Sequence, residues 1–261
     1  MSQQFKASAN YNGPLGLSAA APSVLKQAVL DMPELAHWFS ADTRAANVTR
    51  LSFKDVATGD LIQGYGTTKI GSGINGQQTA VFDGTPSSRL LAPWQLTPSY
   101  SVIGMYRLTA FPTAPALAPI LIDDAGLSDN SPQFEFGPTN VSDNPWLKHQ
   151  QTGTGSHVVD PVTIALNTNY IGYGSFDNAT LQGGVGTNKY TPSATATLNV
   201  GYNGANHLWI GGGVGGLTFT FTGEISDIVV LNVPIHEAAY ATQRANVLNY
   251  LAAKGGITLA A

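Results

Sequence analysis

A strand that runs directly into a helix near the end of the chain constrains the fold most strongly. Apolar and hydroxyl residues alternate over residues 217–222, which places the apolar side chains on one face of a strand. Residues 225–231 are almost all apolar, as expected for a strand that is covered on both faces. We expect the outer cover to be a helix over residues 235–253, with Pro234 at its first position and Gly255 and Gly256 as its C-terminal caps.

Two motifs extend this pattern over most of the chain. The first is Phe221-x-Gly223-x-Ile225, followed by Asp227, Asn232 and Ile235, and then by Tyr250-Leu251-x-x-Lys254-x-Gly256-Ile257; the second is Asn75-Gly76-x-x-x-Ala80-Val81-Phe82-Asp83-Gly84. Together they resemble the closing and early strands of concanavalin A-like domains of the laminin-G type. The resemblance implies an all-β fold, a jelly-roll sandwich of two antiparallel sheets with an N-terminal arm and a C-terminal helix.

The chain divides into an arm and one sandwich. We expect residues 1–34 to form an N-terminal arm with a short helix at 23–30, and residues 35–261 to form the sandwich with its C-terminal helix. The glycine-rich segment 183–192 is interpreted as a loop. Further strands are predicted at 35–39, 79–82, 89–92, 100–109, 119–122, 133–136, 162–166, 170–173, 196–202 and 208–210.

Composition excludes several classes of protein. The 261 residues include no cysteine, so disulfides and thiolate metal sites cannot contribute. Charged residues make up 11% of the chain, the net charge is -4 and the basic residues form no run, which argues against nucleic-acid and membrane partners. Residues 1–10 lack the pattern of an export signal, which predicts synthesis and use without export.

Two loops have the composition of a sugar-binding site, in which an aromatic ring lies beside amides and carboxylates. The alternative is that these aromatic residues cap the sandwich or fill a protein interface. The candidate residues are Asp143, Asn144, Trp146 and His149 in one loop, and Tyr173, Phe176, Asp177 and Asn178 in the other.

Catalytic and metal sites have weaker support. A glycosidase needs two carboxylates that face one cleft, but Glu135 has no acidic residue two positions away. Glu224 and Asp227 are three residues apart, so a regular strand would point them to opposite faces. The oxygen-rich segment 123–130 could hold Ca²⁺ but lacks the EF-hand order, and we predict no catalytic residue and no cofactor.

Fold alone does not decide function among such sandwiches. The low charge, the pliable arm and the missing active site together favour a non-enzymatic virion structural protein of a tailed phage, either a capsid decoration or a fibre component. The arm would anchor the chain, as a homo-oligomer, to other virion subunits after synthesis in the host cytoplasm. The alternative is a carbohydrate-binding, lectin-like module for host recognition, with glycans as partners, and a glycoside hydrolase is a third hypothesis.

Overall fold

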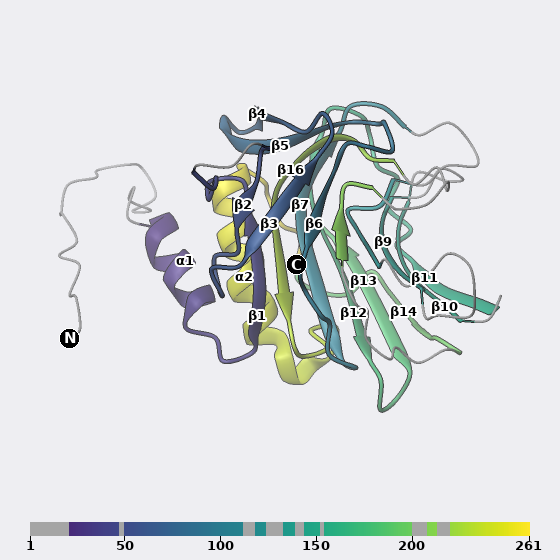
Figure 1. The fold of residues 1–261 in the computed structure, drawn as a ribbon. Coiled ribbons are helices and arrows are strands. Elements are labelled where there is room, and N and C mark those ends of the chain that lie inside the picture. The colour runs from purple at the N-terminus through teal and green to yellow at the C-terminus, as the bar shows by residue number, and fades with distance from the viewer. Residues whose placement is uncertain are drawn as a thin grey trace.

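The computed structural model describes residues 21–46, 50–111, 118–123, 133–138, 144–151, 154–199, 208–212 and 220–261. In this part of the chain two antiparallel sheets face each other (Figure 1). Sheet I has the order β14 (Ala194–Thr197), β13 (Gln182–Thr187), β12 (Asn169–Asp177), β7 (Tyr100–Leu108), β16 (Thr222–Leu231), β5 (Gln77–Asp83) and β4 (Lys69–Ile74), and β1 (Leu35–Ser40) also pairs with β16. Sheet II has the order β11 (Thr154–Val159), β10 (Pro145–Gln151), β9 (Gln133–Pro138), β8 (Leu121–Asp123), β15 (Leu208–Ile210), β6 (Arg89–Ala92), β3 (Leu61–Tyr65) and β2 (Phe53–Lys54).

The main core lies between the two sheets. Strand alternation turns Val102 and Tyr106 of β7 inward from sheet I, and Phe134 and Phe136 of β9 inward from sheet II. All four side chains are fully buried in one apolar cluster. The predicted sandwich of two antiparallel sheets with a C-terminal helix is therefore confirmed.

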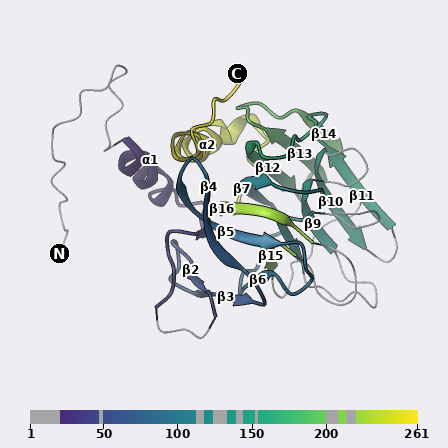
Figure 2. The same cartoon turned by 90° about the horizontal axis from the view of Figure 1, so that it is seen from above.

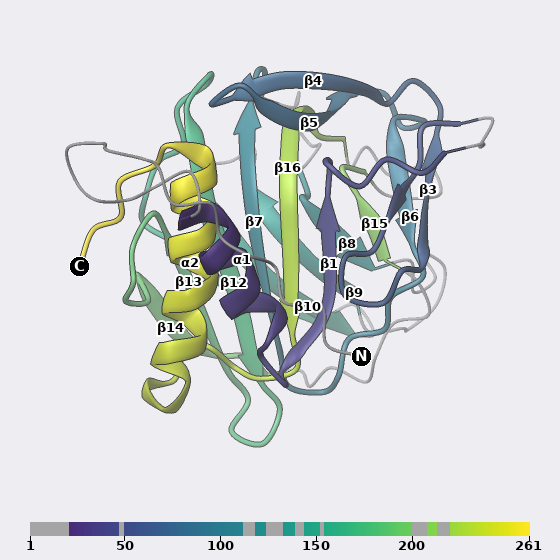
Figure 3. The same cartoon turned by 90° about the vertical axis from the view of Figure 1, so that its left-hand side faces the viewer.

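A second core lies on the outer face of sheet I. Helix α2 (Ala241–Gly255) packs on this face with α1 (Ala21–Leu30) beside it, and both helices lie outside sheet I (Figures 2 and 3). Val229 of β16 is buried in the same apolar cluster as Val247 and Leu251 of α2. The predicted cover over the apolar run is thus confirmed, and it explains why β16 is apolar on both faces.

A β-bulge in the middle of β16 changes the direction of two acidic side chains. The register with β7 shifts between Ile225 and Asp227, so Glu224 pairs with Arg107 and Asp227 pairs with Met105. Met105 and Arg107 are two residues apart and share a face. Glu224 and Asp227 therefore both point outward from sheet I, and the expectation that they lie on opposite faces is wrong.

Several predicted elements differ in the structure. The strands predicted at 196–202 and 217–222 overlap β14 and β16 only at their ends, and residues 200–202 and 217–219 lie outside the described residues. The last helix begins at Ala241 and is preceded by a short 3-10 turn, Ala238–Tyr240, so Pro234 is not its first residue. Residues 162–166 form no strand, whereas the expected loop at 183–192 contains β13. Gly256 has a φ of 63° and caps α2 as predicted.

Helix α1, the described part of the expected arm, is packed onto the sandwich. Residues 1–20 lie outside the described residues. Val29 is fully buried, and the ammonium of Lys26 lies 5.5 Å from the ring centroid of Trp38. The division of the chain at residue 34 stays a prediction. Neither of the described helices has the length and apolarity needed to cross a membrane.

Candidate functional site

The structure does not bring the two predicted sugar-binding loops together into one site. His149 and Phe176 contact each other with ring centroids 4.3 Å apart, but both are buried between the sheets. The His149 ring lies 2.5 Å from the hydroxyl of Tyr100 inside the core. These two residues therefore belong to the packed interior.

Most of the other predicted residues have structural contacts. Tyr173 is buried on the outer face of sheet I, in the cluster that contains α2. Asp177 caps a turn, since its carboxylate accepts bonds from the Thr180 hydroxyl at 2.6 Å and the Ser99 hydroxyl at 3.0 Å. Burial acts to raise the pKa of Asp177, but these hydrogen bonds outweigh it and lower the pKa.

Asn178 and Asn144 also take part in hydrogen bonds within the fold. The backbone N–H of Asn178 donates to the Ser99 hydroxyl at 3.0 Å. The side chain of Asn144 donates to the carbonyl of Val162 at 2.8 Å and so fixes the entry to β10. Asp143 lies outside the described residues.

Trp146 differs from the others because its side chain is half-buried on the outer face of sheet II. The ring centroid of His157 lies 5.3 Å from that of Trp146, and the ammonium of Lys148 lies 5.5 Å from it. Lys148 pairs with His157 across the strands, and His157 is exposed. We call Trp146, Lys148 and His157 the tryptophan platform.

Glu135 of β9 lies next to the tryptophan platform, opposite Lys148. Its side chain is 2% exposed, and its Oε1 atom has no hydrogen-bond partner. Burial raises the pKa of Glu135 to about 7, although the positive charge of Lys148 lowers it in part. The carboxyl group of Glu135 therefore changes its charge near neutral pH, and it lies buried beside the tryptophan platform.

A second aromatic cluster lies on the same outer face. Trp209 of β15 lies 5.3 Å from Tyr65 between ring centroids, and the guanidinium of Arg89 lies 4.4 Å from the Trp209 ring. Strands β9 and β8 separate β15 from β10, and adjacent strands are about 4.8 Å apart. The two aromatic clusters are therefore about 14 Å apart across sheet II.

Strand alternation explains why Trp146 is on the surface while His149 is not. Trp146 and Lys148 are two residues apart and point outward, whereas Leu147 and His149 point into the core. The same rule turns Glu135 outward between two core phenylalanines. Sequence reasoning treated 143–149 as a loop and therefore missed the contribution of Glu135, although the Phe-Glu-Phe alternation was a usable signal.

Metal binding has no support in the described residues, where no three His, Cys, Asp or Glu side chains converge. Segment 124–130, which holds most of the suggested Ca²⁺ loop, lies outside them.

No family model matches the chain, and no curated protein sequence matches it. The structure is similar to domain 4 of AbnA, an extracellular arabinanase of Geobacillus stearothermophilus solved with arabinotriose, with a TM-score of 0.61 and 17% identity over 81% of this chain and 98% of that domain. It is also similar to Trypanosoma rangeli sialidase with sialic acid, with a TM-score of 0.58 and 13% identity over 86% of this chain and 34% of the sialidase.

A third similar structure is the binding domain of Paraclostridial Mosquitocidal Protein 1, with a TM-score of 0.56 and 10% identity over 84% of this chain and 53% of that chain. The chain thus spans about a third of the sialidase and about half of the mosquitocidal chain. At these identities the likeness shows the fold alone, which is a β-sandwich of two antiparallel sheets.

Proposed function

We propose that the chain binds carbohydrate through the tryptophan platform on the outer face of sheet II. The observation that carries this proposal is the half-buried Trp146 ring with a cation and an imidazole beside it. An aromatic ring offers an apolar surface to the C–H face of a sugar, while the ammonium of Lys148 and the ring nitrogens of His157 can bond hydroxyl groups.

Glu135 fits a supporting role in this site. Its Oε1 atom is buried without a partner, which costs about 1–3 kcal/mol in a folded protein. An ionised Glu135 would attract Lys148 and hold its ammonium near the indole of Trp146.

The fold comparisons support the same proposal. Two of the similar structures are in complex with sugars, arabinotriose in one and sialic acid in the other. The alternative stated from the sequence, a lectin-like module, is thus better supported than the virion role. That role, with its phage source, virion localisation, subunit partners and homo-oligomer, stays a prediction, and the expected anchor at residues 1–20 lies outside the described residues.

We further propose that this binding is not accompanied by hydrolysis. A glycosidase of the usual kind needs a second carboxyl group across from the first. In the described strands the outer-face positions next to Glu135 hold Ile122 and Lys148 across the strands and Gly137 along β9, and none of these residues is acidic.

The test is a glycan array followed by titration of the strongest ligand. Trp146→Ala should weaken binding at least about fivefold, because the loss of an aromatic anchor typically costs more than ~1 kcal/mol. Tyr240→Ala is the matched control, since this half-buried aromatic residue lies on the helix side of the molecule. A wild-type chain that binds no glycan, or equal affinities for the two variants, would refute the proposed site.

A further inference from the structure

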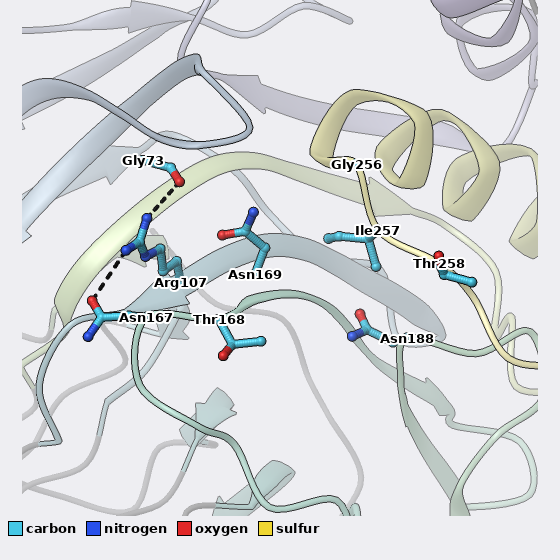
Figure 4. Close-up of a pocket in the computed structure, with 9 residues that line it drawn as sticks. All are labelled: Gly73, Arg107, Asn167, Thr168, Asn169, Asn188, Gly256, Ile257 and Thr258. Carbon is cyan, nitrogen blue, oxygen red and sulfur yellow. Dashed lines mark hydrogen bonds between the residues drawn. The ribbon is translucent and has the colours of Figure 1, made fainter.

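A depression lies on sheet I, beyond the C-terminal end of α2 (Figure 4). Its volume is about 470 Å³, which is within the usual range of roughly 300–1,000 Å³ for small-molecule sites. It lies at the end of the outer face of sheet I that α2 leaves uncovered. Arg107, Asn167, Asn169, Asn188 and Thr258 supply polar side chains around it.

The backbone fixes three amides around this depression. Asn169 pairs with Arg107 across β12 and β7 and so shares its outward face. Asn167 and Asn188 have φ values of 58° and 51°, so both occupy left-handed turn positions that asparagine tolerates. Asn188 also continues the sheet, because its Oδ1 accepts the Ile171 N–H at 2.8 Å. The amides are therefore held by main-chain geometry before any ligand binds.

The free groups of this depression are mainly hydrogen-bond donors. Asn188 Oδ1 already accepts one bond from the Ile171 N–H, whereas both amide N–H donors of Asn188 are left for a ligand. The acceptor of Asn167 is occupied by Arg107 at 3.3 Å, which leaves its amide donors as well. Within the described part of the chain, the Asn169 side chain makes no hydrogen bond to the protein. A ligand that is rich in hydrogen-bond acceptors could accept bonds from these N–H donors.

Arg107 is the one charged residue among those that line the depression. Its guanidinium donates to the Gly73 carbonyl at 2.7 Å and to Asn167, which are both neutral acceptors. The nearby Glu224 carboxylate accepts instead from the Gly73 N–H at 2.7 Å and the Thr79 hydroxyl at 2.5 Å. The charge of Arg107 is thus not matched by an ion pair in the described residues.

We infer that this depression binds a sugar acid of monosaccharide size, separately from the tryptophan platform. The carboxylate of the ligand would face Arg107, because guanidinium and carboxylate form charge-assisted bonds. Its hydroxyl oxygens would accept from Asn167, Asn169 and Asn188. With no aromatic ring in the lining, the site would rely on hydrogen bonds, in contrast to the platform on sheet II.

The experiment titrates the full chain with D-glucuronate and with methyl glucoside, followed by NMR. Glucuronate should bind in a saturable way and about tenfold or more tighter than the glucoside, since a bond to a charged group contributes about 1.5–3 kcal/mol. Arg107→Gln should abolish this preference. Asn169→Ala, which removes no bond within the described part of the protein, should weaken glucuronate binding about two- to tenfold.

Two controls separate this site from the platform. Gln27→Ala removes an exposed amide on α1 and should leave both affinities unchanged. Trp146→Ala should also leave glucuronate binding unchanged, so failure of the platform and failure of this site give different results. Absent saturable glucuronate binding, an unchanged affinity in Asn169→Ala, or a loss in Trp146→Ala would each overturn the inference.

Discussion

Replacing Glu135 by glutamine would remove the ionisable group beneath the tryptophan platform while keeping its size. Because burial raises the pKa of Glu135, the folded protein keeps a proton that the unfolded chain has already released. Below pH 4.5 both states hold the proton, so the group has no effect on the pH dependence. Between pH 4.5 and about 7 the free energy of unfolding should fall as the pH rises, and above that window the loss should be complete.

The size of this effect follows from the pKa. A rise from the ordinary value of 4.5 to about 7 corresponds to about 3 kcal/mol, at about 1.4 kcal/mol per pH unit. Glu135→Gln carries no charge at any pH and should escape this loss. At pH 8 the variant should therefore be more stable than the wild type by about 3 kcal/mol, or by roughly 6–12 °C in Tm for a chain of this size.

The assay is thermal and urea unfolding of both proteins from pH 4 to pH 9. The two stability curves should coincide near pH 4 and diverge as the pH rises to 7. Asp83→Asn is a control of the opposite sign. Burial acts to raise the pKa of Asp83, but hydrogen bonds from Thr67 and Thr85 lower it to about 2, so this substitution should decrease stability at neutral pH.

Parallel curves for Glu135→Gln and the wild type would refute the reasoning, because they would mean that Glu135 ionises alike in the folded and unfolded chain. A variant that is less stable at pH 8 would refute it more strongly. That result would show that the ionised carboxylate makes net favourable contacts, with Lys148 as the first candidate partner.

Three further substitutions probe the packing of α2 and of the segment before it on sheet I. Lys254→Met should lower the free energy of unfolding in urea by about 3–5 kcal/mol. Lys254 lies 2.9 Å from the fully buried Asp227, and its loss leaves that carboxylate without a counter-charge. Asp42→Asn should cost much less, because Asp42, the other partner of Lys254, is 43% exposed. Gly184→Ala should cost about 1–3 kcal/mol in the same assay, because a Cβ atom there would lie 2.3 Å from the Cβ of His236. An unchanged stability in Lys254→Met or in Gly184→Ala would contradict the packing described.

Strands with clear alternation could be predicted from the sequence, whereas glycine-rich ones could not. The strand predicted at 89–92 has the bounds of β6, Arg89–Ala92, because its pattern is local. In β13 the glycines suggested a loop, yet Gly184 and Gly186 are required because His236 and Tyr173 pack directly over them. The reason for these glycines lies in residues far along the chain, so no local pattern could reveal it.

The candidate site was predicted in part for the same reason. Trp146 was identified from its residue type, but grouping it with His149 ignored the strand, in which residues three apart face opposite ways. Glu135 was weighed only as half of a catalytic pair. Its position beside Lys148 depends on the register of β9 with β10. The two strands are separate segments, and no local pattern in the sequence predicts how they pair.

The bulge in β16 determines which side chains of this strand point to the outer face of sheet I. Residues before it, from Thr222 to Ile225, pair with β5, and residues after it pair with β1. Without the extra residue, Asp227 and Glu224 would point to opposite faces, and one of these carboxylates would enter the apolar core between the sheets. With the bulge, Asp227 meets Lys254 of α2, while Glu224 bonds the backbone of Gly73 beside the depression. The bulge thus lets Asp227 attach the helix to the sheet, while Glu224 lies opposite Arg107 on the same face and bonds Gly73 rather than Arg107.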